Sequence, residues 1–187
     1  MNMNKYTEKA QEAVVAAQQL ADREGHAEML PEHLLVTLIE QREGIVPSII
    51  QKIGADPAAV ATAVRGELGR LPRAHGGSQV TLSPRLRAVT DAAEQEAERL
   101  KDDYVSTEHL FVAIASEGRR STASRILEQH RITRDAILQA LTTVRGSQRV
   151  TSQNPESTYE ALARYGRDLT AHSGGDGGRI GTDLLND

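Results

Sequence analysis

The chain has 187 residues, which suits one domain or two small ones, and its 22 Lys and Arg residues against 26 Asp and Glu residues give a formal net charge of -4. This mildly acidic balance, with aromatic residues at only 3%, argues against a nucleic-acid partner, because such a partner needs a basic surface and stacking rings. The absence of Cys excludes disulfides, thiolate nucleophiles and Cys-based metal sites.

The first residues, Met-Asn-Met-Asn-Lys, contain no apolar signal core. No apolar run approaches the roughly 18 residues that a membrane helix needs. We therefore expect a soluble, cytoplasmic, helix-rich protein without a membrane partner.

An internal repeat organises most of the chain. The segment Glu-His-Leu-Leu at 32–35 recurs as Glu-His-Leu-Phe at 108–111, an offset of 76 residues. Small residues such as Ala17 and Ala93 match at the same offset. The sequence therefore predicts two copies of one unit, repeat one over 6–71 and repeat two over 82–146.

Each copy is expected to form four short helices, because apolar residues recur at helical spacing after N-cap and Pro signals. In repeat one the predicted helices cover about 7–24, 31–39, 47–53, which ends at the C-cap Gly54, and 56–68. In repeat two they cover 84–100 after the N-cap Ser83, a helix that Glu108 begins, 121–129 and 133–144. A turn-rich linker over 72–79 joins the copies.

The region after repeat two differs in composition from the repeats. A linker over 147–172 is polar at first and then carries one more helical pattern after Pro155. Residues 173–187 are Gly-rich and polar, so we expect a flexible, disordered tail. The predicted organisation is thus a double-repeat domain over 1–146, a linker with a helix, and a tail.

The paired Glu-His-Leu segments, Tyr-Val-Ser-Thr-Glu-His at 104–109 and Ser-Pro-Arg at 83–85 together resemble the double Clp N-terminal repeat domain of Clp-type unfolding ATPases. The resemblance covers about residues 5–170, and segments 145–152, 158–162 and 165–170 are similar to the ClpB branch. It implies an all-α fold in which two tandem four-helix Clp repeats pack about a pseudo-twofold axis, followed by a linker helix.

The resemblance implies a mobile module that captures unfolded or aggregated polypeptide for the ATPase ring of a disaggregase, which cooperates with an Hsp70-type chaperone. The phosphate-binding pattern Gly-x-x-x-x-Gly-Lys-Ser/Thr is absent, and no Gly-Lys pair occurs. We therefore expect a non-catalytic, monomeric recognition domain without a cofactor. Two alternatives stay open: an adaptor-docking or phosphoarginine-binding module as in ClpC-type unfoldases, and a standalone Clp-repeat binding protein.

A first candidate site lies at equivalent helix starts of the two repeats. Thr7 and Ser83 are predicted to cap equivalent first helices, and Glu32 and Glu108 to begin equivalent second helices. Helix N-termini attract anions, and a carboxylate beside them can accept a guanidinium bidentately. The set resembles the phosphoarginine pockets of ClpC N domains. The alternative is that Thr7 and Ser83 are only caps and the two Glu residues only favour the helix dipole.

A second candidate site is an apolar groove near the start of repeat two. Its predicted lining is Leu86, Val89, Thr90, Tyr104 and Leu110, with Asp102 and Glu108 at the rim. The resemblance to ClpB adds Thr7, and it links Thr7, Asp102 and Glu108 to activity. Apolar contact tolerates many sequences, which suits unfolded segments. The alternative is that Leu86, Val89 and Leu110 are ordinary core residues.

His33 and His109 each follow a Glu, one in each repeat. No second His at helical spacing supports a metal site, so we expect each His to pack at a helix start and bind a neighbouring backbone group. No Gly-x-Ser-x-Gly elbow supports a catalytic triad. The sequence therefore predicts no catalytic residue and no metal ligand.

Overall fold

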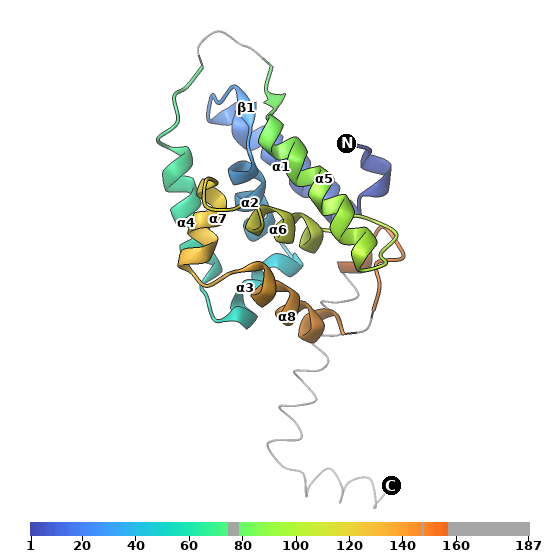
Figure 1. The fold of residues 1–187 in the computed structure, drawn as a ribbon. Helices are drawn as coiled ribbons and strands as arrows, with labels where there is room; N and C mark the ends of the chain where they lie inside the picture. The colour runs from blue at the N-terminus through green and yellow to red at the C-terminus, as the bar shows by residue number, and fades with distance from the viewer. Residues whose placement is uncertain (75–78, 147, 157–187) are drawn as a thin grey trace, which may run out of the picture.

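A computed structural model describes residues 1–74, 79–146 and 148–156 (Figure 1). Within these residues, eight α-helices account for nearly all regular structure: α1 (Glu8–Arg23), α2 (Pro31–Glu40), α3 (Ile45–Ile53), α4 (Pro57–Leu68), α5 (Pro84–Arg99), α6 (Thr107–Ala115), α7 (Thr122–Gln129) and α8 (Arg134–Arg145). A 3-10 turn η1 (Met3–Lys5) and two short strands, β1 (Glu28–Met29) and β2 (Thr81–Leu82), complete the order. The all-α prediction is confirmed.

The helices start where the local signals predict. The hydroxyl of Thr7 accepts a hydrogen bond from the Ala10 amide at 3.2 Å, and that of Ser83 accepts one from the Leu86 amide at 3.0 Å. Helix α3 is an exception, because it begins at Ile45 and not at the predicted Pro47. A proline fits anywhere in the first helical turn, since its missing N–H would have no helical partner there, so it does not mark the first residue reliably.

Helices α2 and α6 lie in the middle of the molecule (Figure 1). Eight of the ten residues of α2 and eight of the nine residues of α6 are buried, as expected for helices surrounded by others. Around them α3 packs beside α8 and α4 beside α7, so each pair joins the two repeats. One continuous core results, which compensates for the small area that a single four-helix unit could bury.

Two short parallel β contacts bring the start of a helix in one repeat beside the start of a helix in the other repeat, an arrangement that we call exchanged helix starts. Strand β2, before α5, pairs with β1, before α2, and aligns Leu82 with Met29. Tyr6, before α1, forms the equivalent bridge with Val105, before α6. The start of the first helix in each repeat therefore lies beside the start of the second helix of the other repeat. The sequence pattern did not predict this exchange.

Several expectations concern regions that the structure does not test. The predicted linker helix after Pro155 and the tail over 173–187 lie outside the described residues, and the division of the chain at 146 and 172 remains a prediction. Residues 148–156, which we call the strap, are described and contact both repeats. None of the described helices is long and apolar enough to cross a membrane.

Candidate interaction sites at the exchanged helix starts

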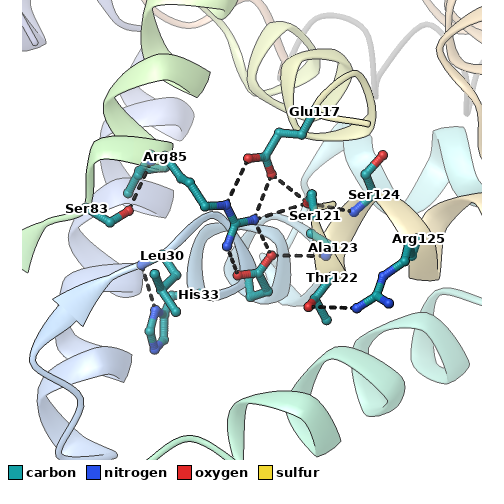
Figure 2. Close-up of polar contacts among 12 residues, drawn as sticks. Leu30, His33, Ser83, Arg85, Glu117, Ser121, Thr122, Ala123, Ser124 and Arg125 are labelled. Carbon is teal, nitrogen blue, oxygen red and sulfur yellow. Dashed lines mark hydrogen bonds and ion pairs between the residues drawn. The ribbon is translucent and has the colours of Figure 1, made fainter. Parts of the chain in front are cut away.

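The start of α2 holds an ion cluster that joins the two repeats (Figure 2). The Arg85 guanidinium, from the first turn of α5, donates to both carboxylate oxygens of Glu32, at 3.1 and 2.9 Å. It also donates to both oxygens of Glu117, at 3.2 and 3.1 Å, and to the Ser121 hydroxyl at 3.1 Å. The Ala123 amide at the start of α7 completes the shell of Glu32 at 3.0 Å. This bidentate geometry is the strong form of a guanidinium–carboxylate contact.

This cluster changes the interpretation of the first predicted site. Glu32 already binds a guanidinium, and that guanidinium comes from its own chain. Ser83 caps the helix that carries Arg85, and its amide donates to the carbonyl of Met29 at 3.1 Å, so Ser83 lies on the Glu32 side. The predicted cap and carboxylate of one repeat therefore do not meet, because each cap lies beside the carboxylate of the other repeat.

The equivalent location in the other half brings Thr7 and Glu108 to one side of the fold. The Thr7 amide donates to the carbonyl of Val105 at 2.9 Å, and its hydroxyl donates to the carboxyl oxygen Oε1 of Glu156 in the strap at 2.8 Å. The same oxygen accepts a long hydrogen bond of 3.5 Å from the Thr107 amide. Thr7 and Glu108 are both fully buried. The strap thus covers this half of the first candidate site.

Glu108 is held in an environment that disfavours its charged form. Neither of its carboxyl oxygens has a hydrogen-bond partner among the described residues. Burial, reinforced by the nearby Glu156 carboxylate, raises the pKa of Glu108 to about 8. Burial also raises the pKa of Glu156. Glu108 therefore carries a proton at neutral pH, in contrast to a solvent-exposed rim residue.

Asp102, the other predicted rim residue, is buried and binds three partners. His109 Nε2 donates to its oxygen Oδ2 at 2.7 Å, the Val150 amide donates to Oδ1 at 2.8 Å, and the Arg145 guanidinium binds Oδ1 as well. The Asp102 side chain is fully buried. Burial acts to raise the pKa of Asp102, but these hydrogen bonds lower the pKa overall. Asp102 thus stays ionised and connects α6, α8 and the strap.

The apolar residues of the predicted groove belong to the shared core. Leu86, Val89, Thr90 and Leu110 are each at most 2% exposed. Tyr104 is half-buried against that core, and among the predicted lining residues it is the one that keeps contact with solvent. The structure therefore places these four residues in the packed interior and not along an open groove, and Leu86 lies at the opposite end of α5 from Tyr104.

The two histidines bind backbone groups as the sequence predicts. His33 Nδ1 accepts from the Leu30 amide at 2.9 Å, and His109 Nδ1 accepts from the Ser106 amide at 2.8 Å. A neutral His33 must then carry its proton on Nε2, which lies 2.8 Å from Nδ1 of His26 and donates to it. Among the residues that the structure describes, no group of three or more His, Cys, Asp or Glu side chains could hold a metal ion.

The buried His26–His33 pair makes stability sensitive to acid. Burial and the neighbouring His26 lower the pKa of His33 to about 4, so the unfolded chain binds more protons on this residue between about pH 6.5 and pH 4. We expect His33 to cost the fold about 2–3 kcal/mol as pH falls through this window. His26→Asn keeps an acceptor for Nε2–H but cannot become charged, so the acid-induced loss should shrink. Urea denaturation at pH 7 and pH 4.5 measures both proteins, and an equal loss in the two would contradict the assignment.

One surface feature was not predicted from the sequence. A cavity of about 280 Å³ lies between α1 and α2, and its lining includes Glu12, Ala16, Gln19, Thr37, Glu40 and Arg65. An ion pair of 2.6 Å between Arg65 and Glu40 contributes to its edge. Two small residues of α1, Ala13 and Ala16, belong to its lining. The cavity is mixed in chemistry and separate from both predicted sites.

Comparison with known sequences identifies the family. Residues 5–130 match the family model described as the Clp repeat (R) N-terminal domain. The chaperone protein ClpB of Nitratidesulfovibrio vulgaris is 44% identical over 173 residues, which cover 90% of this chain and 20% of that protein. ClpB of Mycobacterium bovis is 42% identical over 168 residues, which cover 89% and 20%. The chain thus spans about a fifth of the length of these curated relatives.

Solved structures agree on the fold. The Hsp104 N-terminal domain from Candida albicans matches with a TM-score of 0.72 at 21% identity and covers 82% of this chain and 99% of its own. The N-terminal domain of the ClpV1 ATPase from E. coli matches with a TM-score of 0.67 at 23% identity and covers 82% and 92%. At this identity the likeness shows the fold alone, while the family match spans more than half of the sequence. The chain therefore belongs to the Clp repeat N-terminal domain family, and its curated relatives are ClpB chaperones.

Proposed function

We propose that this chain is the substrate-recruiting N-terminal domain of a ClpB-type disaggregase. It would bind unfolded or aggregated polypeptide and deliver it to an ATP-driven motor that lies outside these 187 residues, in cooperation with an Hsp70-type chaperone. The observation that carries the proposal is the 44% identity to a ClpB chaperone over 90% of the chain. The domain would act by binding and not by catalysis.

Client contact is proposed to begin at Tyr104. Its ring packs on the shared core with one side toward solvent, an amphipathic placement that favours reversible contact with apolar segments. The buried Leu86, Val89, Thr90 and Leu110 would then stabilise the core and not touch the client directly. Thr7, Asp102 and Glu108 would join the contact surface only when the strap moves away.

A titration with a permanently unfolded polypeptide, reduced and carboxymethylated α-lactalbumin, tests this function by fluorescence anisotropy. We expect Tyr104→Ala to weaken binding roughly three- to tenfold, the range of an ordinary interface residue. Val15→Ala is the matched control, because Val15 is an exposed apolar residue on α1 that the proposal does not use. Absence of saturable binding by the parent chain would refute recruitment itself, whereas unchanged binding by Tyr104→Ala would refute only its location.

A second function is docking of an adaptor or of phosphoarginine: Glu32 has the geometry to hold a guanidinium bidentately, but a ligand guanidinium would have to displace Arg85. A solved complex of a ClpV N-domain with a VipB peptide has the same fold, with a TM-score of 0.63 at 16% identity. Calorimetry with free phosphoarginine separates this function from client recruitment, since only docking predicts saturable binding that a Glu32→Ala, Glu108→Ala variant loses. A standalone, monomeric Clp-repeat binding protein is the remaining proposal, and sedimentation tests the monomer.

A further inference from the structure

The two exchanged helix starts are equivalent in fold, but among the described residues only one of them pairs its buried glutamate with a cation. Glu32 is neutralised by Arg85, whereas no described cation forms an ion pair with the equivalent Glu108. Lys9 occupies the position equivalent to Arg85 in repeat one, but its ammonium donates to the carbonyl of Arg42 at 2.9 Å. The group that approaches Glu108 is another carboxyl, that of Glu156.

The strap that carries Glu156 is fixed to both repeats. Its Gln153 carbonyl accepts from the Glu8 amide at 2.7 Å, on the first turn of α1. Its Val150 carbonyl accepts from the Asp103 amide at 2.8 Å, just before α6, and Val150 is fully buried. The strap therefore spans the exchanged contact between Tyr6 and Val105 and places Glu156, which is 1% exposed, over Thr7.

Two carboxyl groups in such a place cannot both be ionised at low cost. Both oxygens of Glu108 and the oxygen Oε2 of Glu156 have no hydrogen-bond partner among the described residues. The other charged groups that act on Glu108 are Arg145 of α8, which is already bound to Asp102, and Asp102 itself. Lys9 of α1 is the cation that acts on Glu156. Like charges in a buried site leave one of the two carboxyls protonated.

We propose that the strap is a proton-linked cover: its docking on Thr7 and Glu108 takes up a proton, and loss of that proton releases it and exposes this edge of the domain. The sign follows from the pKa of Glu108, which is raised to about 8 when the strap is docked and returns toward its ordinary value near 4.5 when the site opens to water. Docking is therefore fully favoured below about pH 4.5 and weakens progressively as pH rises toward 8. Strap docking involves no client polypeptide, so an experiment on the strap can fail while the proposed recruitment of clients holds, and the reverse.

Amide hydrogen exchange followed by NMR measures the strap directly. The reporters are the amides of Glu8, Asp103 and Val150, which bond across the strap, and the reference is the amide of Ile49 inside α3. After correction for the intrinsic exchange rate, we expect the opening constant of the three reporters to rise roughly ten- to fifty-fold between pH 6 and pH 8, with Ile49 unchanged.

Three variants test the chemistry. Glu156→Gln leaves the buried Glu108 in place and Glu108→Gln leaves the buried Glu156, so each should strengthen docking at pH 8 and reduce the pH dependence, and the double variant should abolish it. Glu98→Gln, on the exposed face of α5, should behave like the parent chain. Reporters that are unprotected at pH 6, protection that is independent of pH in the parent chain, or an undiminished pH dependence in the Glu108→Gln, Glu156→Gln double variant would each overturn the proposal.

Discussion

Arg85→Ala should destabilise the domain by about 2–4 kcal/mol, because it leaves the largely buried Glu32 and Glu117 carboxylates without their shared cation. The Arg85 guanidinium is partly exposed, so the lost ion pairs themselves contribute little to the destabilisation. Most of it comes from leaving the Glu32 and Glu117 carboxylates buried without a cation. The loss should appear in urea denaturation as a lower midpoint with an unchanged slope.

Three further variants identify the cause of that loss. Arg85→Lys should recover only part of the stability, since an ammonium cannot bind two carboxylates bidentately. Adding Glu32→Gln to Arg85→Ala should recover some stability as well, because it removes one uncompensated charge. Arg87→Ala, an exposed arginine on the same helix, is the control and should lie within about 0.5 kcal/mol of the parent chain. If Arg87→Ala and Arg85→Ala lose the same stability, the contacts of the Arg85 cluster do not stabilise the packing of the two repeats.

Local features of this fold could be predicted from the sequence because their interactions span only a few residues. The caps at Thr7 and Ser83 bind amides three residues away, and Gly54 ends α3 in the left-handed region with φ of 103°. The offset of 76 residues also predicts that α2 and α6 are equivalent helices, because Glu-His-Leu at 32–34 recurs at 108–110. That both helices are buried came from the structure.

The pairing of the caps with the carboxylates could not be predicted in this way. It depends on the exchange at Tyr6–Val105 and Met29–Leu82, and bridges this short have no periodicity in the sequence. Arg85 and Glu32 likewise belong to different repeats, so no helical spacing relates them. The helical spacing of apolar residues does not distinguish a buried core position from the lining of a groove. Leu86 and Val89 therefore fitted both interpretations, and the structure buries them.

One missed contact did have a signal in the repeat. The offset that aligns His33 with His109 also aligns His26 with Asp102. In repeat one His26 binds Nε2 of His33, and in repeat two Asp102 binds Nε2 of His109. Once the structure shows that His26 binds His33, this alignment leads one to expect that Asp102 faces His109. Its bonds to Arg145 and to the strap have no counterpart in repeat one and needed the structure.

Asp102→Asn should cost about 2–4 kcal/mol at pH 7, although it changes one atom. His109 must carry its proton on Nε2, because Nδ1 accepts from the Ser106 amide, so an amide NH₂ facing Nε2 would set two donors against each other. If the amide turns its oxygen toward His109 instead, its NH₂ faces the buried Arg145 and the Val150 amide. Either orientation leaves a buried group unsatisfied.

The pH dependence of this variant separates the ionic interaction from simple packing. Because the folded domain lowers the pKa of Asp102, its contribution is present above the ordinary value near 3.8 and is lost as pH falls through the lowered value. The stability difference between the parent chain and Asp102→Asn should therefore be largest near pH 7 and shrink in acid. Asp103→Asn, the exposed neighbour, should show no such difference at any pH. A penalty for Asp102→Asn that does not change between pH 7 and pH 3 would mean that the residue acts through its shape, and the ionised node that connects α6, α8 and the strap would be wrong.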